Sequence, residues 1–98
     1  MKFEIAPKST EIRANWEEAR LYCFSLNING KTGWRLPNIE ELCEIYQSEI
    51  YFGQEWHWYW SSTQGNGDTV WLLDFNDGYQ YYDVKTNGYY VRAIRDLS

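Results

Sequence analysis

The chain has 98 residues, a formal net charge of −5 and an unusually high aromatic content of 19%. This length suffices for one modest hydrophobic core, so we expect a single domain over residues 1–98. The acidic balance disfavours nucleic acid, sulfated polysaccharides and anionic membranes as partners, because proteins that bind them usually carry basic surfaces. It favours a protein partner whose surface is basic or neutral, although the charge can also serve only to keep the protein in solution.

The sequence also bears on location and on metal binding. No apolar run approaches the roughly 18 residues that span a membrane, and no basic segment followed by an apolar stretch marks a secretory signal. We therefore expect a cytoplasmic protein, or one that leaves with a virion or a host cell. Cys23 and Cys43 form no CxxC pair, so free thiols are favoured over a disulfide or a zinc site. No cofactor is indicated.

The first predicted elements are an edge strand over residues 2–6, a connector, and a helix that begins after Asn15. Glu18 stands three residues after Asn15, as a capping box requires. Four apolar residues then follow at helical spacing and form one stripe: Trp16, Ala19, Cys23 and Leu26. The helix should end near Asn27.

A second helix is predicted over residues 39–47. Asn38 and Glu41 repeat the capping-box spacing at its start. Its apolar face consists of Ile39, Leu42, Cys43 and Tyr46. The glycine-containing loop between the two helical segments rules out one continuous helix.

The segment Trp34–Pro37 precedes this second helix. Pro37 favours an extended conformation for Leu36, so we expect Trp34 and Leu36 to enter the core beneath the helix. Arg35 carries five N–H donors in a planar group, which a carboxylate or main-chain carbonyls can hold.

Beyond residue 50 the pattern changes to strands. The predicted strands are residues 58–63, 69–75, 79–84 and 89–95. The second of these is apolar on both faces and should lie inside the sheet, and the turns fall at Asn76–Gly78 and Asn87–Gly88. Helices and strands segregate along the chain, which predicts an α+β fold with two helices packed on a mainly antiparallel sheet.

An ordered series of motifs extends from residue 15 to residue 95. The motifs are Trp16-Glu-Glu-Ala19 with Cys23, Trp34-Arg-Leu-Pro37, Glu41-Leu42, Tyr59-Trp-Ser-Ser-Thr63, Trp71 with Phe75, and Val91-Arg92 with Arg95. Together they resemble the Lcl C-terminal domain family. The resemblance implies a C-type-lectin-like fold, distantly similar to formylglycine-generating enzyme and to phage receptor-binding proteins. It implies a binding or adhesin module and no known reaction.

The chain departs from this family in two ways. Members often carry a second cysteine in the last strand, and this chain has Ala93 there, so a bond from the first helix to the last strand cannot form. Such a loss fits a reducing compartment. The family's N-terminal segment also looks shortened, so the resemblance is not carried over to residues 1–14.

Catalysis and metal binding have weak support in the sequence. His57 lies near Ser61 and Ser62, but no acid is placed to orient it as a nucleophilic triad requires. The cluster Asp68, Asp74, Asn76 and Asp77 invites a calcium site. The lectin calcium motifs are absent, however, and the hairpin turn explains these residues, so neither a catalytic residue nor a metal ligand is predicted.

The aromatic residues outnumber what one small core needs, so some rings should reach the surface, where tyrosine and tryptophan are enriched at binding hot spots. Tyr79 and Tyr81 share a predicted strand face with Asp83, and residues 51–58 are rich in rings, although these rings can also fold back as a satellite core. The predicted binding residues are Glu55, Trp56, His57, Trp58, Asp77, Tyr79, Tyr81 and Asp83.

These residues lead to a prediction of function. We predict a non-catalytic module that binds a protein partner through aromatic and acidic loops. An extension of this prediction is a phage or mobile-element protein that antagonises a host protein. The alternative is a glycan-binding or adhesin module displayed on a cell or virion surface.

Overall fold

The computed structural model describes residues 2–48 and 58–97. Its elements, in chain order, are β1 (Phe3–Ile5), a 3-10 helix (Lys8–Thr10), β2 (Ile12–Ala14), α1 (Trp16–Ser25), β3 (Trp34–Arg35), α2 (Ile39–Gln47), β4 (Trp58–Gln64), β5 (Thr69–Asp74), β6 (Gln80–Val84), β7 (Tyr89–Val91) and β8 (Ile94–Asp96). The predicted α+β class with two helices is confirmed. Of the helices in these ranges, none has the length and apolar character that crossing a membrane requires.

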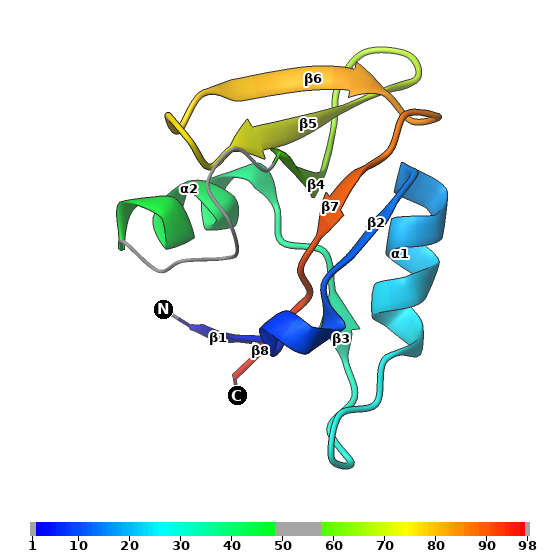
Figure 1. Ribbon diagram of the computed structural model, residues 1–98, viewed down its shortest axis with the longest axis vertical. Helices are drawn as coiled ribbons and strands as arrows, with labels where there is room; N and C mark the ends of the chain where they lie inside the picture. The colour runs from blue at the N-terminus through cyan, green and yellow to red at the C-terminus, as the bar shows by residue number, and fades with distance from the viewer. Residues whose placement is uncertain (1, 49–57, 98) are drawn as a thin grey trace.

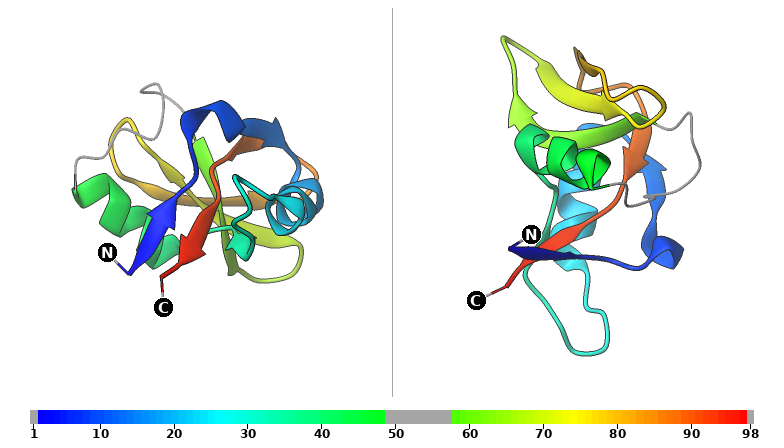
Figure 2. Two further views of the ribbon diagram at one scale, coloured as in Figure 1. Left: turned by 90° about the horizontal axis from the view of Figure 1, so that it is seen from below. Right: turned by 90° about the vertical axis from the view of Figure 1, so that its left-hand side faces the viewer.

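The strands form two sheets, where the sequence predicted one. The larger sheet has the order β2-β7-β4-β5-β6, and the smaller sheet has the order β1-β8-β3. Figure 1 shows α1 and α2 on opposite sides of β4 and β7. The two termini lie close together in both views of Figure 2, because β1 pairs antiparallel with β8.

The helix α1 begins where the sequence predicted, because Asn15 forms a complete capping box. Glu18 N–H donates to Asn15 Oδ1 at 3.0 Å, and Asn15 N–H donates to Glu18 Oε1 at 3.2 Å. These bonds satisfy donors that have no partner within the helix. The buried side chains of α1 are Trp16, Ala19 and Cys23, which belong to the predicted apolar stripe.

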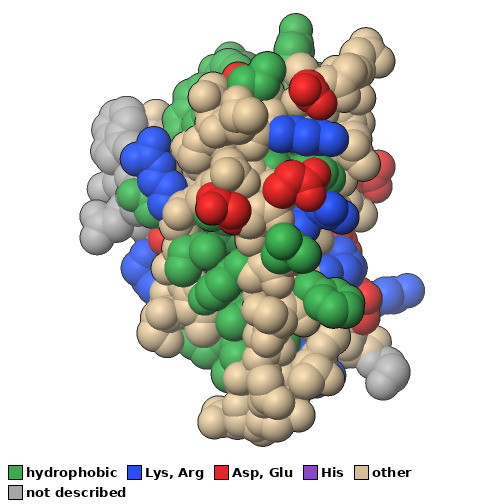
Figure 3. Space-filling model, turned by 90° about the vertical axis from the view of Figure 1, so that its right-hand side faces the viewer, with side chains coloured by type: hydrophobic (Ala, Val, Ile, Leu, Met, Phe, Trp, Pro, Cys, Tyr) green, Lys and Arg blue, Asp and Glu red, His purple; other side chains and the backbone are tan. Residues whose placement is uncertain are grey.

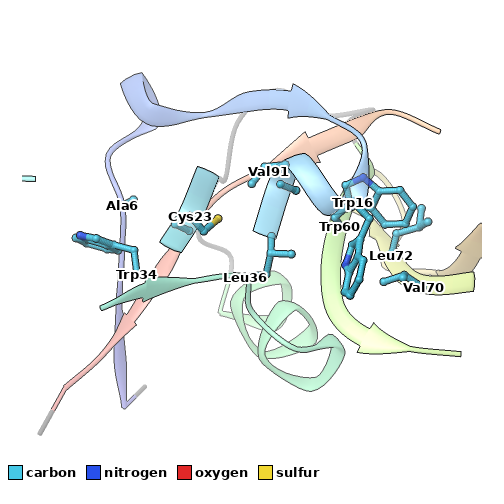
Figure 4. Packing of buried hydrophobic residues seen from close by; sticks show 11 residues of the cluster. Ala6, Trp16, Cys23, Trp34, Leu36, Trp60, Val70, Leu72 and Val91 are labelled. Carbon is cyan, nitrogen blue, oxygen red and sulfur yellow. The ribbon is translucent and has the colours of Figure 1, made fainter. Parts of the chain in front are cut away.

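The larger core cluster fills the space between α1 and one face of the five-stranded sheet. Its buried members are Ala6, Trp16, Ala19, Cys23, Trp34, Leu36, Trp60, Val70, Leu72, Val91 and Ala93. Figure 4 shows the cluster extending from Ala6 and Trp34 at one end to Trp16 and Trp60 at the other. The indole N–H groups of Trp16 and Trp60 donate to main-chain carbonyls at 2.9 and 3.0 Å, so burying these rings leaves no indole donor without a partner.

The helix α2 covers the opposite face of the sheet. It has the predicted limits, and Asn38 and Glu41 form the second capping box with two bonds of 2.8 Å. Beneath it lies a smaller core cluster, whose buried members are Phe3, Leu42, Ile45, Tyr59, Leu73 and Ile94. Each helix therefore has its own core, and the five-stranded sheet lies between the two.

The segment before α2 joins three elements. Trp34 and Leu36 are buried, as predicted, but they lie in the larger core cluster against α1 and not in the smaller cluster beneath α2. Arg35 donates to the carboxylate of Glu41 at 2.9 and 2.7 Å, and to that of Asp96 at 2.7 and 3.2 Å. One guanidinium therefore ties β3 to the start of α2 and to the end of β8.

The prediction of one continuous strand over residues 89–95 is wrong. The strand breaks at Arg92 and Ala93, and its two halves, β7 and β8, join different sheets. The break places the Arg92 side chain in the interior, where it donates to Ala6 O at 3.1 Å and lies 3.4 Å from the carboxylate of Glu11. The segment before α1, expected to be a connector, contains the strand β2, which pairs with β7.

Candidate functional site

Several predicted binding residues share one face of the five-stranded sheet. Tyr79, Tyr81 and Asp83 alternate along the chain, and alternate residues of a strand point to the same side. The register of β5 with its two neighbours carries this face to β4, where Trp58 points the same way. Tyr89 of β7 contacts Trp58 there. We call Trp58, Tyr79, Tyr81, Asp83 and Tyr89 the aromatic–acidic face.

The rings of this face form a continuous series. The centroids of Tyr79 and Tyr81 are 6.2 Å apart, and Tyr81 lies 4.4 Å from Trp58 at an interplanar angle of 30°. Trp58 stacks on Tyr89 at 6.1 Å, and Tyr89 meets the buried ring of Trp60 edge-on at 4.9 Å. Tyr79 is 63% exposed and Tyr81 is 38% exposed. Contacts between the rings restrict the rotamers of these side chains before any partner binds, so less conformational entropy is lost on binding.

Asp83 supplies a fixed negative charge to this face. It accepts hydrogen bonds from the Tyr89 hydroxyl, from Asn87 Nδ2 at 2.7 Å and from Val84 N–H at 2.7 Å. The bond from Tyr89 contributes most to lowering the pKa of Asp83, and the bond from Asn87 adds to it. Burial, with the bond to Asp83, raises the pKa of Tyr89 to about 12. At neutral pH the face therefore carries an ionised carboxylate beside a neutral phenol.

Asp77 lies in the turn at the end of this face, and its carboxylate supports the turn. Asp77 Oδ1 accepts the N–H of Tyr79 at 2.9 Å, and Asp74 Oδ1 accepts the N–H of Asn76 at 2.8 Å. Gly78 closes the turn with a bond of 2.7 Å to Asp74 O and has φ +80°. The predicted turn is confirmed, and Asp77 remains exposed beside the aromatic–acidic face.

Three of the predicted binding residues, Glu55, Trp56 and His57, lie outside the described residues. The prediction that the segment before Trp58 contributes to binding therefore stays a prediction, as does its alternative of a satellite core. Among the predicted residues that are described, the structure places Trp58, Tyr79, Tyr81 and Asp83 together and Asp77 next to them.

The surplus of aromatic residues reaches the surface mainly as tyrosine. The exposed large apolar residues are Leu21, Phe24, Tyr79, Tyr81, Tyr82, Val84 and Leu97. Every tryptophan in the described ranges is buried or half-buried. The indole rings of Trp16, Trp34 and Trp60 lie in the larger core cluster, where their N–H groups donate to main-chain carbonyls. The tyrosines of the outermost strand are left in contact with water.

Sequence reasoning missed a second exposed apolar area, on α1. Leu21 and Phe24 lie beside a hollow of about 350 Å³, and Phe24 is 83% exposed. The residues that line the hollow are Arg20, Leu21, Phe24, Trp34, Arg35, Leu36 and Ser62. Figure 3 views the molecule from the side of α1 and shows hydrophobic side chains gathered below a belt of charged ones. Two apolar residues three positions apart, opposite the buried stripe, were the sequence signal for this area.

The hydroxyl of Ser61 and the thiol of Cys23 are not activated as nucleophiles. Ser61 is buried and donates to Trp71 O at 2.6 Å while it accepts the N–H of Thr63 at 3.0 Å. Its neighbour Ser62 is exposed. Burial raises the pKa of the Cys23 thiol to about 12. Within residues 2–48 and 58–97, no three His, Cys, Asp or Glu side chains are placed to hold a metal ion.

Comparison with known proteins adds one finding. A model of the Lcl C-terminal domain matches residues 4–95 of the chain. The match extends the resemblance, expected from residue 15 onward, to include two of the three residues of β1 and the whole of β2. A search of the curated proteins finds no match.

Proposed function

Because the chain belongs to the Lcl C-terminal domain family, we propose that it is a non-catalytic binding module whose aromatic–acidic face recognises a partner protein. On the same resemblance we assign its two helices and two sheets to the C-type-lectin-like class of folds. The observation that carries the proposal is the row of exposed tyrosines on β6 and the turn before it, backed by the half-buried Trp58.

The geometry of the face supports this proposal. Truncating tyrosine at an interface often removes a large share of the binding free energy. The ring buries a large area, and only a few rotatable bonds lose their freedom on binding. Here Tyr79 contacts Tyr81, and Tyr81 contacts Trp58, so a partner would meet a preformed surface. Their hydroxyl groups add hydrogen-bonding capacity at the rim of that surface.

The charge of the face favours a partner with a basic surface. Asp83 is ionised and accepts hydrogen bonds from its neighbours, and Asp77 is exposed in the turn before β6. The chain as a whole has a formal net charge of −5. Complementary charge speeds association and fixes orientation more than it adds affinity. An acidic module of this kind suits a phage or mobile-element protein that occupies the basic groove of a host nucleic-acid-binding protein.

The chemistry of the described residues supports a binding role over a catalytic one. A nucleophilic cysteine requires a low thiol pKa, and the burial of Cys23 shifts its pKa the other way. The hydroxyl of Ser61 is occupied by two main-chain groups. Neither side chain offers the pairing with a base that covalent catalysis uses.

A glycan-binding or adhesin module is the second candidate function, and the exposed tyrosine rings beside carboxylates favour it. A ring face can stack on a sugar ring, and carboxylates accept hydrogen bonds from sugar hydroxyls. The affinity for a neutral glycan, which presents mainly hydroxyl groups, would depend little on salt. The affinity for a basic protein would fall as salt screens the charges.

The experiment that tests the proposal compares surface variants. Immobilised wild-type chain, the double variant Tyr79→Ser/Tyr81→Ser and the control Phe24→Ser are incubated with host lysate at low and high salt, and bound proteins are quantified by mass spectrometry. We expect some proteins to be recovered equally with the wild type and with Phe24→Ser. The amount of these proteins recovered with the double variant should be lower by about tenfold or more, as for the loss of hot-spot residues. Thermal melting confirms that each variant is folded.

Two outcomes would contradict the proposal of a protein partner. One is equal recovery of every protein by the double variant and the wild type. The other is specific binding on a glycan array that Tyr79→Ser/Tyr81→Ser abolishes, with no protein lost from the pull-down, because this result assigns the face to sugars.

A further inference from the structure

The outer edge of β6 is the longest open strand edge in the described part of the chain. β6 lies at the end of the five-stranded sheet and pairs only with β5. It has five residues, whereas the other edge strands β1 and β2 have three each and β3 has two. In Figure 1, β6 forms the outermost strand, and its free edge lies away from the other labelled elements. Such an edge presents main-chain groups that another extended chain can pair with.

The register shows which main-chain groups face outward. In an antiparallel pair, alternate residues exchange hydrogen bonds with the partner strand. Tyr79 O accepts a bond of 2.9 Å from β5, and Lys85 N–H donates one of 3.0 Å to the residue that precedes β5. The odd-numbered residues of β6 therefore face β5. The even-numbered residues, whose N–H and C=O groups point away from the sheet, are Gln80, Tyr82 and Val84.

One end of this edge is closed and the other end is open. Val84 N–H donates to Asp83 Oδ1 at 2.7 Å, and Val84 O accepts the N–H of Asn87 at 3.2 Å. No turn, cap or loop bond within residues 2–48 and 58–97 involves the main chain of Gln80 or Tyr82. Two N–H and two C=O groups are therefore free to pair with an added strand.

The usual devices that protect a strand edge are missing from β6. Proteins commonly place lysine, proline or a bulge on an exposed edge. The sequence of β6 is Gln-Tyr-Tyr-Asp-Val, and its register with β5 continues without a shift over all five residues. Its one charged side chain, Asp83, is turned back to Tyr89 and Asn87.

The two faces beside this edge differ in chemistry. Tyr81 and Asp83 lie on one face with Tyr79, while Tyr82 and Val84 are exposed on the other. A strand added here would place alternate side chains against an acidic aromatic face and an apolar face. Cationic residues alternating with apolar ones match both faces at once.

Charge also discriminates between the possible occupants. A second copy of this chain would bring the same carboxylates to the edge and a further net charge of −5. Lys85, the residue that follows β6, lies over the Trp16 ring at 4.8 Å and therefore faces α1. A basic segment of another protein therefore fits the edge better than a second copy.

We propose that an extended segment of a partner protein, with alternating cationic and apolar residues, adds to the open edge of β6 at Gln80 and Tyr82 as a sixth strand. This inference rests on the proposed function, since it specifies how the same region would bind. Main-chain pairing supplies the affinity, and the tyrosine and aspartate side chains select the sequence.

The first test uses defined peptides. A fluorescent nine-residue peptide of alternating lysine and valine is titrated into the isotope-labelled wild-type chain at low salt. The control peptide has the same sequence and is N-methylated at two adjacent central residues. The methyl groups remove one main-chain N–H donor on each edge of the peptide strand and leave every charge in place. We expect the unmethylated peptide to shift the amide signals of Gln80 and Tyr82 and to bind at least about tenfold more tightly than the methylated peptide. A peptide of alternating glutamate and valine should not bind.

The second test changes the protein at a single position. Tyr82→Pro removes an outward N–H and leaves the bonds to β5 in place, because the main chain of Tyr82 does not face β5. Tyr82→Thr is the matched control, since it loses the same ring and keeps the N–H. We expect Tyr82→Thr to retain most of the peptide affinity and Tyr82→Pro to lose at least about tenfold relative to it. If the proline variant does not fold, the methylated peptide decides the question on the wild-type chain.

The outcomes separate this inference from the proposed function. Equal binding of methylated and unmethylated peptides, lost in Tyr79→Ser/Tyr81→Ser, overturns strand addition and leaves the aromatic–acidic face as a binding surface. Equal affinity of Tyr82→Pro and Tyr82→Thr overturns strand addition as well. Absence of binding by either peptide at millimolar concentration also overturns it, and the pull-down comparison then decides the proposed function alone.

Discussion

The contact between Arg35 and Glu41 allows a quantitative prediction about stability. Arg35 makes two hydrogen bonds of 2.9 and 2.7 Å to the Glu41 carboxylate, whose side chain is only 19% exposed. Bonds between charged groups contribute about 1.5–3 kcal/mol each when buried, and solvent screening at the partly exposed guanidinium reduces this. We expect a coupling free energy of about 1–1.5 kcal/mol for the pair. Asp96 adds little, because its side chain is 69% exposed.

A double-mutant cycle measures this coupling. The variants are Arg35→Met, Glu41→Gln and the double variant, and the assay is urea unfolding followed by tryptophan fluorescence at pH 7. Glutamine at position 41 keeps an oxygen that can accept the N–H of Asn38, so the capping box survives the change. Arg35→Met alone should lower the free energy of unfolding by about 1–2 kcal/mol.

The same pair gives a prediction of pH dependence. Hydrogen bonds from Arg35 lower the pKa of Glu41 and that of Asp96 in the folded state. A group whose pKa is lowered by folding stabilises the folded state at pH values above its pKa in the unfolded chain, which is about 4.3 for glutamate and 3.9 for aspartate. This stabilisation is lost as the pH falls through the pKa of the group in the folded state. The stability difference between wild type and Arg35→Met should therefore be constant from about pH 6 to 8 and shrink below about pH 4. A coupling near zero at pH 7, or one that grows in acid, would refute this reasoning.

Three further predictions concern single residues. Gly78→Ala should destabilise the protein by about 1–3 kcal/mol, because φ is +80° and the new Cβ would lie 2.5 Å from the Tyr46 ring; Gly67→Ala, at φ +59° in open space, is the control and should lower the thermal midpoint less. Tyr59→Phe should lower the urea midpoint by an amount equivalent to about 1–2 kcal/mol, since it removes a 2.7 Å bond to a carboxylate, and an unchanged midpoint would argue against this. Cys23 should react with iodoacetamide at a negligible rate in the native protein at pH 8 and readily in urea, because burial raises the pKa of its thiol to about 12; rapid native labelling detected by mass spectrometry would contradict this.

The candidate site could be predicted in part. The alternation of Tyr79, Tyr81 and Asp83 is a local property of a strand, so the sequence alone placed them on one face. The stacking of Trp58 on Tyr81 and the hydrogen bond from Tyr89 to Asp83 depend on the order of strands in the sheet, which alternation along the chain does not encode.

The exposed area on α1 shows the same limit. The buried stripe that contains Trp16, Ala19 and Cys23 was predictable from helical spacing. Whether Leu21 and Phe24, on the other side of the helix, are covered depends on which distant segments pack there. The structure leaves both exposed beside the hollow next to β3.

The sequence by itself determined the two helices and the turn at Gly78. Each capping box joins residues three positions apart, and the hairpin turn needs one glycine with positive φ, so short-range chemistry suffices. Only the tertiary structure decided where the last strand breaks and which sheet each half joins. Residues 89–95 favour an extended chain throughout, and the break at Arg92 arises because β7 pairs with β2 and β4 while β8 pairs with β1 and β3. Those partners are distant in sequence, and their pairing follows from burying two cores at once.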